Sequence, residues 1–121
     1  MESSTSRAAE AADRTPPLDL LPLRTLLQRI EEKFHPEQVW LFGSRARGDA
    51  RPWSDWDLFV VVPDDTDEGL LDPRVAWRLK RGSGVQADVI PCRASEFRDA
   101  SDTVNTLSYV VASEGVLIYG R

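Results

Sequence analysis

The sequence predicts a small α/β (α+β) domain, with a mixed β-sheet of three to four strands and helices packed on one face. Short apolar runs, which are typical of strands, alternate with segments in which apolar residues recur at helical spacing. Strands that alternate with helices indicate one sheet covered by helices. The chain has 121 residues, which suits one domain and leaves little room for a second.

The first 17 residues are expected to be a disordered tail. They are rich in Ala, Ser, Thr and charged residues, and they end in Pro16-Pro17. They also lack the basic segment followed by an apolar run that marks a signal peptide. We therefore expect residues 18–121 to form the domain.

A helix and a strand open this domain. Apolar residues recur at helical spacing over residues 20–34. Asp19 can cap this helix, and His35-Pro36 ends it. The apolar residues 39–42 are then expected to form a short strand.

The next segment combines a tight turn with a buried strand. Gly43 ends the first strand, and residues 44–48 predict a single helical turn. A polar loop follows over residues 49–54. Residues 57–62 give the strongest strand signal in the chain, and their continuous apolar run suggests burial on both faces.

The last third of the chain predicts two helices and two strands. Four-residue steps between apolar side chains predict a helix over residues 70–80, and residues 85–91 follow as a strand. A second long helix is expected over residues 103–114, closed by Gly115. Residues 116–119 are expected to form a last short strand.

Two carboxylates project together from the start of the buried strand. Residues i and i+2 of a strand point to the same face, so Asp55 and Asp57 lie side by side. Two like charges this close repel each other and are costly to desolvate, unless a cation lies between them. Carboxylate oxygens suit Mg²⁺, which binds through a few carboxylates together with substrate phosphates.

A third carboxylate, Asp88, lies within the strand over residues 85–91, where Asp is intrinsically disfavoured. If this strand pairs beside the strand that follows Asp55 and Asp57, the three acids share one sheet face. Such a set can hold two metal ions, which clamp the attacking and leaving oxygens of an in-line phosphoryl displacement. We interpret the three residues as catalytic metal ligands. The alternative for Asp88 is an edge-strand charge that prevents aggregation.

The turn at Gly43-Ser44 can bind phosphate. Gly43 lets the backbone turn tightly, and the free N–H groups of the short helix behind it favour an anion. Ser44 can cap that helix or donate its hydroxyl to a phosphate. We interpret Arg47 as a phosphate or partner contact, whereas Arg45 and Arg51 are more readily explained as surface charges. The chain has no Gly-Lys-Ser/Thr, so a P-loop is excluded.

Together these motifs resemble the signature of the polymerase-β-like nucleotidyltransferase superfamily: Gly-Ser, about ten residues, Asp-x-Asp/Glu, and a further acid on a later strand. The matching segments are Gly43-Ser44-Arg45-Ala46-Arg47-Gly48 and Ser54-Asp55-Trp56-Asp57-Leu58, with Asp88 as the later acid. The length of the chain and its Gly-Ser-Arg-Ala-Arg-Gly segment look most like the minimal nucleotidyltransferases. Trp56 is a departure, because relatives usually have an aliphatic residue there. Its side chain should face away from the metals.

The resemblance implies a nucleotidyltransferase fold that transfers a nucleoside monophosphate, with ATP as the expected donor, two Mg²⁺ ions as cofactors and pyrophosphate as the leaving group. Asp88 would take the proton of the acceptor hydroxyl. Many minimal nucleotidyltransferases are encoded beside a HEPN-domain protein and act as its antitoxin. The resemblance therefore implies a HEPN toxin as partner and one of its side chains, such as a tyrosine, as acceptor.

Two alternatives stay open for the function. The chain could be a non-catalytic module that neutralises a toxin by contact, although such a module does not need clustered carboxylates. It could also modify a small molecule such as an aminoglycoside, although such enzymes usually carry an additional substrate domain. Trp53, beside the acids, could stack on a nucleobase, and Trp77 is expected in the core or at an interface.

Charge and composition exclude several classes of protein. The net charge of -5 disfavours nonspecific binding to nucleic acid. The single cysteine, Cys92, excludes an intrachain disulfide and fits a cytoplasmic protein. No apolar run approaches the ~20 residues that a membrane span requires. Because a domain of this size has a small core, a partner or a second copy could add to its stability.

Overall fold

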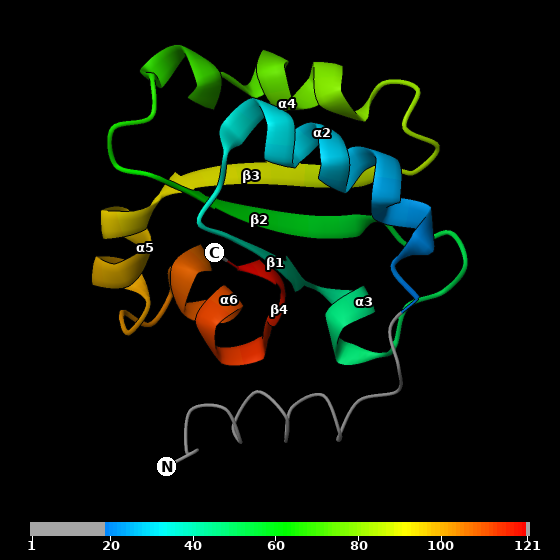
Figure 1. Ribbon diagram of the computed structural model, residues 1–121. Coiled ribbons are helices and arrows are strands. Elements are labelled where there is room, and N and C mark those ends of the chain that lie inside the picture. The colour runs from blue at the N-terminus through cyan, green and yellow to red at the C-terminus, as the bar shows by residue number, and fades with distance from the viewer. Residues whose placement is uncertain (1–18, 121) are drawn as a thin grey trace.

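The structure, a computed structural model, describes residues 19–120 and is built around one four-stranded sheet (Figure 1). The strand order is β3-β2-β1-β4; β2 and β3 are parallel, and the other pairs are antiparallel. The strands are β1 (Gln38–Phe42), β2 (Trp56–Val62), β3 (Ala87–Arg93) and β4 (Val116–Gly120). The predicted fold class, a small mixed sheet with helices, is confirmed. The expected tail over residues 1–17 lies outside the described residues.

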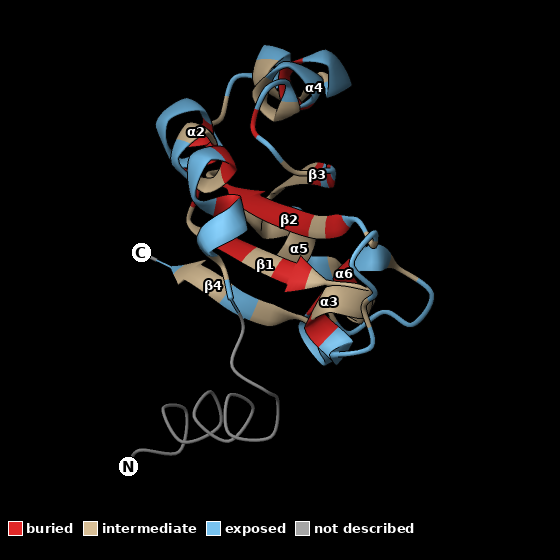
Figure 2. Ribbon diagram, turned by 90° about the vertical axis from the view of Figure 1, so that its right-hand side faces the viewer, coloured by how far each residue is buried: buried red, intermediate tan, exposed pale blue. Residues whose placement is uncertain are grey.

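Helices pack on both faces of this sheet (Figure 2). One face is covered by η1 (Leu21–Leu23), α2 (Arg24–Phe34) and α4 (Pro73–Lys80). The other carries α5 (Ala94–Ala100) and α6 (Leu107–Glu114), and the remaining helical segments are α3 (Ser44–Arg47) and η2 (Glu68–Leu71). The sequence predicted helices on one face of the sheet. In the structure α2 and α4 cover one face over the larger core, and α5 and α6 cover the other face as well.

The second covered face follows from the pattern of β2. Its residues Leu58 and Val60 point toward α2 and α4, whereas Phe59 and Val61 point the other way and are equally buried. Val111 of α6 is fully buried among this second set. A strand that is apolar at successive positions needs cover on both faces, so the expected burial of β2 on both faces is confirmed.

Three expected elements differ in their limits. The strand expected over residues 85–91 runs two residues later, and α5 follows it at once, a helix that the sequence did not predict. The helix expected over residues 103–114 begins only at Leu107, because the hydroxyl oxygen of Thr106 accepts a hydrogen bond from the Tyr109 amide at 3.1 Å and caps it there. In the same way Asp72 caps α4, which therefore begins at Pro73 and not at Leu70.

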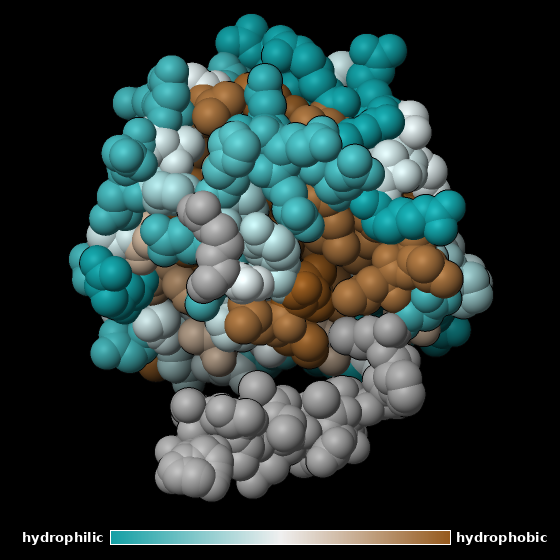
Figure 3. All heavy atoms as spheres, in the orientation of Figure 1, coloured by the Kyte–Doolittle hydropathy of each residue, from teal (hydrophilic) through white to brown (hydrophobic). Residues whose placement is uncertain are grey.

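The surface divides into hydrophilic and apolar regions. Figure 3 shows hydrophilic residues over α2 and α4, and hydrophobic residues gathered below α2 in the region of η1 and β4. Leu21 of η1 and Leu117 of β4 are exposed. None of the helices within residues 19–120 has the length and apolar character needed to cross a membrane.

Candidate active site

The predicted site residues meet at one end of the sheet. Because β1 runs antiparallel to β2 and β3, its end and the starts of those two strands lie at the same end of the sheet (Figure 1). The turn at Gly43, the loop over residues 48–55 and the loop over residues 81–86 therefore share this end. The amide of Trp56 donates to the Gln86 carbonyl at 3.0 Å, which ties the last two loops together.

Asp57 and Asp88 are direct neighbours across the parallel strands β2 and β3. Their Cα atoms are partners in the register, and residues so paired point to the same face of the sheet. The sequence-based prediction that the Asp88 strand lies beside the Asp57 strand is thus confirmed. Trp56, between the acids, is buried with the core on the α2 and α4 face, so it faces away from Asp57 as expected.

The electrostatics of Asp57 show that the three acids are close enough to influence one another. Partial burial raises the pKa of the Asp57 carboxyl, and the carboxylates of Asp88 and Asp55 raise it further. The guanidinium of Arg47 acts in the opposite direction. Burial first, and the neighbouring negative charges second, thus disfavour the ionised form of Asp57.

The acids do not form a ready-made metal cage. Within residues 19–120, no three acidic, His or Cys side chains are arranged so that they could hold a metal ion by themselves. Asp55 and Asp88 are exposed. Mg²⁺ usually binds through one or two carboxylates and completes its shell with water and substrate phosphates, so the donor set fits that ion when a nucleotide supplies the remaining ligands.

Gly43 brings the backbone close to Asp57. Its φ of 78° is left-handed, and a Cβ atom at this position would overlap the Asp57 carboxylate. The next residues turn into α3, where the amides of Ala46 and Arg47 both donate to the Gly43 carbonyl at 3.1 Å. The predicted order of strand, tight glycine turn and single helical turn beginning at Ser44 is therefore present beside the acids.

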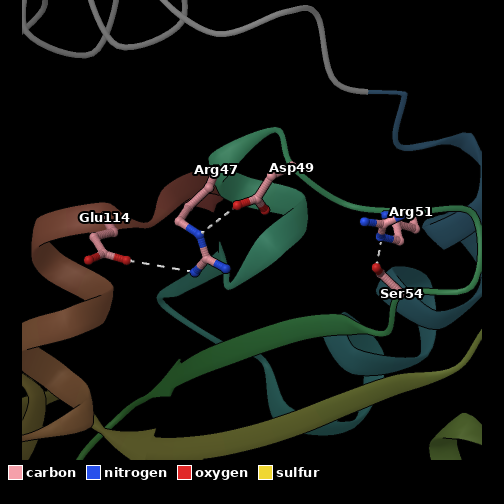
Figure 4. A network of polar contacts seen from close by, with 5 residues as sticks. All are labelled: Arg47, Asp49, Arg51, Ser54 and Glu114. Atoms are coloured by element: carbon pink, nitrogen blue, oxygen red, sulfur yellow. Dashed lines mark hydrogen bonds and ion pairs between the residues drawn. The ribbon is translucent and has the colours of Figure 1, made fainter.

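Arg47 links this turn to the far side of the site (Figure 4). Its Nε lies 3.4 Å from an oxygen of Asp49, and its Nη1 lies 4.0 Å from an oxygen of Glu114 on α6. The side chain is about half exposed, at 49%. Its charge also lowers the pKa of the Asp57 carboxyl, so Arg47 acts on the acid that faces the turn.

Arg45 has a structural role. Its guanidinium lies over the Trp56 ring, 4.2 Å from the ring centre, and donates two hydrogen bonds to the Ser54 carbonyl at 3.1 and 2.8 Å. It also reaches the Pro52 carbonyl at 3.3 Å. These contacts hold the loop that leads to Asp55. Arg51 instead contacts an exposed side chain: its guanidinium lies 5.7 Å from the centre of the Trp53 ring, which is 73% exposed.

Residues 23–112 match the family described as nucleotidyltransferase domain. The chain belongs to this family. In this nucleotidyltransferase domain the matched region contains the Gly43 turn and all three acids.

Two solved structures share its fold. One is a crystal structure of a toxin-antitoxin with AMP-PNP, with a TM-score of 0.59, 19% identity, and coverage of 81% of this chain and 73% of that one. The other is a protein of Sulfolobus solfataricus assigned as a nucleotidyltransferase, with a TM-score of 0.54, 26% identity, and coverage of 94% and 87%. A comparison with curated proteins finds no significant match.

Two adjoining cavities open next to the acids of this nucleotidyltransferase. One of about 300 Å³ is lined by Asp55 and Asp88 and by Trp77, Lys80 and Arg81 from the end of α4. The other, of about 460 Å³, includes Arg45, Trp53 and Trp56, and Val85 and Gln86 line both. The sequence-based prediction did not connect the end of α4 with the site. The feature that could have indicated this connection is the run of cations from Arg74 to Arg81, which contains no acid.

Proposed function

We propose that the chain transfers AMP from ATP to a hydroxyl group of a partner protein, and that this modification neutralises a toxin. The carrying observation is the register pair of Asp57 and Asp88 next to the Gly43-Ser44 turn, since it combines oxygen ligands for a divalent cation with a backbone turn suited to phosphate. Membership of the nucleotidyltransferase domain family supports the reaction class.

In the proposed reaction, an acceptor hydroxyl oxygen forms a bond to the α-phosphorus of ATP, and the bond from that phosphorus to the bridging oxygen breaks. Pyrophosphate leaves, and Asp88 accepts the hydroxyl proton. Asp55, Asp57 and Asp88 would hold two Mg²⁺ ions, which supply positive charge for the attacking and leaving oxygens.

The remaining groups bind and orient the donor. Amides of the Gly43-Ser44 turn and the Ser44 hydroxyl would bind the β- and γ-phosphates, and Arg47 would add a cation beside them. Arg47 is suited to this role because its side chain is about half exposed. It pairs with Asp49 and Glu114, and its charge still acts on the Asp57 carboxylate.

A protein acceptor is supported by one neighbour in fold. That structure is a toxin-antitoxin with AMP-PNP, a nonhydrolysable relative of ATP. The resemblance of the Gly-Ser-Arg-Ala-Arg-Gly segment to minimal nucleotidyltransferases favours a HEPN-domain protein as the toxin, with a tyrosine as a suitable acceptor.

The test incubates the chain with ATP labelled in the α-phosphate, Mg²⁺ and the protein encoded by the adjacent gene. We expect label on that protein and release of pyrophosphate, both abolished by EDTA. Asp57→Ala should lower transfer at least about a hundredfold, because it removes the central charge-stabilising ligand. Asp65→Ala, an exposed loop acid outside the site, is the matched control.

The same variants separate catalysis from neutralisation by contact. If Asp57→Ala still binds the partner but no longer protects cells, chemistry is the working mechanism. Protection by Asp57→Ala equal to that by the wild type would instead establish the contact mechanism and contradict the proposal.

A further inference from the structure

The cavity beside Asp88 has two chemically different sides. Asp55 and Asp88 lie at the starts of the strands, whereas Trp77, Lys80 and Arg81 come from the end of α4. The cavity, of about 300 Å³, is therefore lined by acidic residues as well as by a cationic and aromatic rim. The Asp88 side chain points to the sheet face opposite α4, so the two sides of the cavity meet at the edge strand β3. Nothing in the donor-binding scheme above uses this rim.

The sheet order places this cavity opposite the phosphate turn. β2 lies between β1 and β3, so the Gly43-Ser44 turn is on one side of Asp57 and the loop that precedes β3 is on the other. An in-line displacement requires the attacking group and the leaving group on opposite sides of the phosphorus. If the triphosphate occupies the β1 side, the acceptor approaches from the β3 side, where this cavity lies.

The rim belongs to a segment that carries only positive charges, although the chain as a whole is acidic. Residues 73–86 contain four Lys or Arg residues and no acid, although the whole chain has a net charge of -5. Arg74 pairs with Asp72 at 2.8 Å. Neither Lys80 nor Arg81 forms an ion pair with another residue that the structure describes.

The end of α4 is held in place by a residue from another helix. The guanidinium of Arg29, on α2, donates to the carbonyl of Leu79 at 2.9 Å and to the carbonyl of Arg81 at 2.7 Å. These bonds use backbone carbonyls at the α4 end and do not involve the side chains of Lys80 and Arg81. The backbone that carries the cationic rim is therefore anchored to α2.

Exposed tryptophans add the second property of a protein interface. Trp77 is 55% exposed, and the Arg81 guanidinium lies 5.0 Å from its ring centre. Trp53, at the adjoining cavity, is also exposed and has Arg51 over its ring. Trp and Arg are the residue types that contribute most to binding at protein interfaces.

We propose that this rim binds an acidic segment of the acceptor protein, with the hydroxyl residue of that segment placed at Asp88. The inference rests on the proposed function and names the class of its acceptor. A peptide can place a neutral hydroxyl residue at the carboxylates and its acidic residues over Lys80 and Arg81. A nucleic acid would bring a phosphate with every nucleotide to a chain whose net charge is -5, which disfavours its binding.

The test measures binding without catalysis. Three fluorescein-labelled peptides of equal length contain one tyrosine, flanked by Glu, by Gln or by Lys. Fluorescence anisotropy with the full chain should show binding of the Glu peptide, weakened by salt, and none of the Lys peptide. Lys80→Glu combined with Arg81→Glu should weaken that binding about tenfold or more, since two favourable charge contacts become repulsive.

A matched control and a competitor complete the design. Lys33→Glu changes an exposed cation in the last turn of α2, which does not line the cavity, and should leave peptide binding unchanged. AMP-PNP with Mg²⁺ should not displace the Glu peptide, and its own affinity should be unchanged in the Lys80→Glu/Arg81→Glu variant. Failure of the proposed function would appear separately, as absent AMP-PNP binding or transfer while the Glu peptide still binds.

Several results would overturn the inference. These are equal binding of all three peptides or of none, the same affinity after Lys80→Glu/Arg81→Glu, and displacement of the peptide by AMP-PNP, which would assign the rim to the triphosphate. Tighter binding of a single-stranded RNA of the same length, lost in the same variant, would assign it to a nucleic-acid acceptor.

Discussion

Gly43 occupies a position where both the backbone and a neighbour exclude a side chain. With φ 78° and ψ -159°, its conformation belongs to a region that is essentially restricted to glycine. A Cβ atom there would also overlap the Asp57 carboxylate. The Gly43-Ser44 turn therefore lies close against Asp57, and Gly43 sets the distance between the turn and this acid.

We expect Gly43→Ala to destabilise the fold through two effects that can be separated: the strain of a positive φ at a residue with a Cβ atom, and the overlap of that atom with the Asp57 carboxylate. Asp57→Ala removes the overlapping carboxylate, so the double variant should recover part of the loss, with an interaction energy of about 1–3 kcal/mol in a urea-unfolding cycle. Gly82→Ala is the matched control, because Gly82 also has a positive φ, 69°, but has no atom within 4 Å of the added Cβ. Its cost, about 1–2 kcal/mol, should be unaffected by Asp57→Ala. Strict additivity of Gly43→Ala and Asp57→Ala would contradict the predicted contact.

Single-residue patterns predicted the acids better than the cations. The alternation of strand residues predicted that Asp55 and Asp57 lie together, because a strand has only two faces. Asp88 joined them only on the condition that its strand pairs with β2, which the structure meets. The partners of Arg45 depend on how the loop over residues 48–55 folds back, and no local pattern specifies that path. The binding of Arg45 to the Ser54 carbonyl and its position over Trp56 are visible only in three dimensions.

At the scale of elements, the pairing of β2 and β3 sets Asp57 against Asp88. In the unfolded chain the Asp57 carboxyl has its ordinary pKa of 3.8, and in the folded chain burial and the neighbouring acids raise that pKa. The folded state thus binds this proton more tightly than the unfolded state. The free energy of unfolding therefore falls as the pH rises from 3.8 through the raised value, and the full loss is present above it.

Asp57→Asn removes this penalty and should raise the melting temperature at neutral pH. The rise should be modest, because a partly exposed charge is screened by solvent. At a pH of about 3, the Asp57 carboxyl is mostly protonated in both states, so the difference between variant and wild type should largely vanish. Thermal unfolding followed by circular dichroism at both pH values measures this, with Asp65→Asn as the control. A difference that persists unchanged into acid would show that it does not arise from ionisation of Asp57.

Elements with a strong period were predicted well, and elements set by caps were not. Apolar residues at helical spacing identified α2, and the apolar run identified β2, since each pattern fits one kind of structure. The start of α6 depends on the cap at Thr106, and the predicted helix began four residues earlier, at residue 103. The short α5 follows β3 without a break, so no turn residue marked its beginning.

At the scale of the whole molecule, the fold separates stability from chemistry. The larger core lies between the sheet and the helices α2 and α4, and its buried residues include Leu23, Leu26 and Ile30. The acids, the Gly43-Ser44 turn and the cationic rim all lie at one end of the sheet, in loops and strand ends that this core supports. The sequence predicted the acids and the turn but not the rim, and their shared end depends on the strand order, which no local pattern determines.

This arrangement predicts where the stable domain begins. Residues 1–17 have no periodic apolar pattern, so a chain that starts at Leu18 should unfold at the same temperature as the full chain and bind AMP-PNP equally well. A chain that starts at Arg24 also loses Leu20, which packs on the core, and Leu23, which is fully buried. It should be less stable by at least about 2–5 kcal/mol, the cost of emptying one buried leucine site. Urea unfolding of the three chains measures both effects. If the chain starting at Leu18 were destabilised as much as the one starting at Arg24, the tail would belong to the folded domain and the boundary at residue 18 would be wrong.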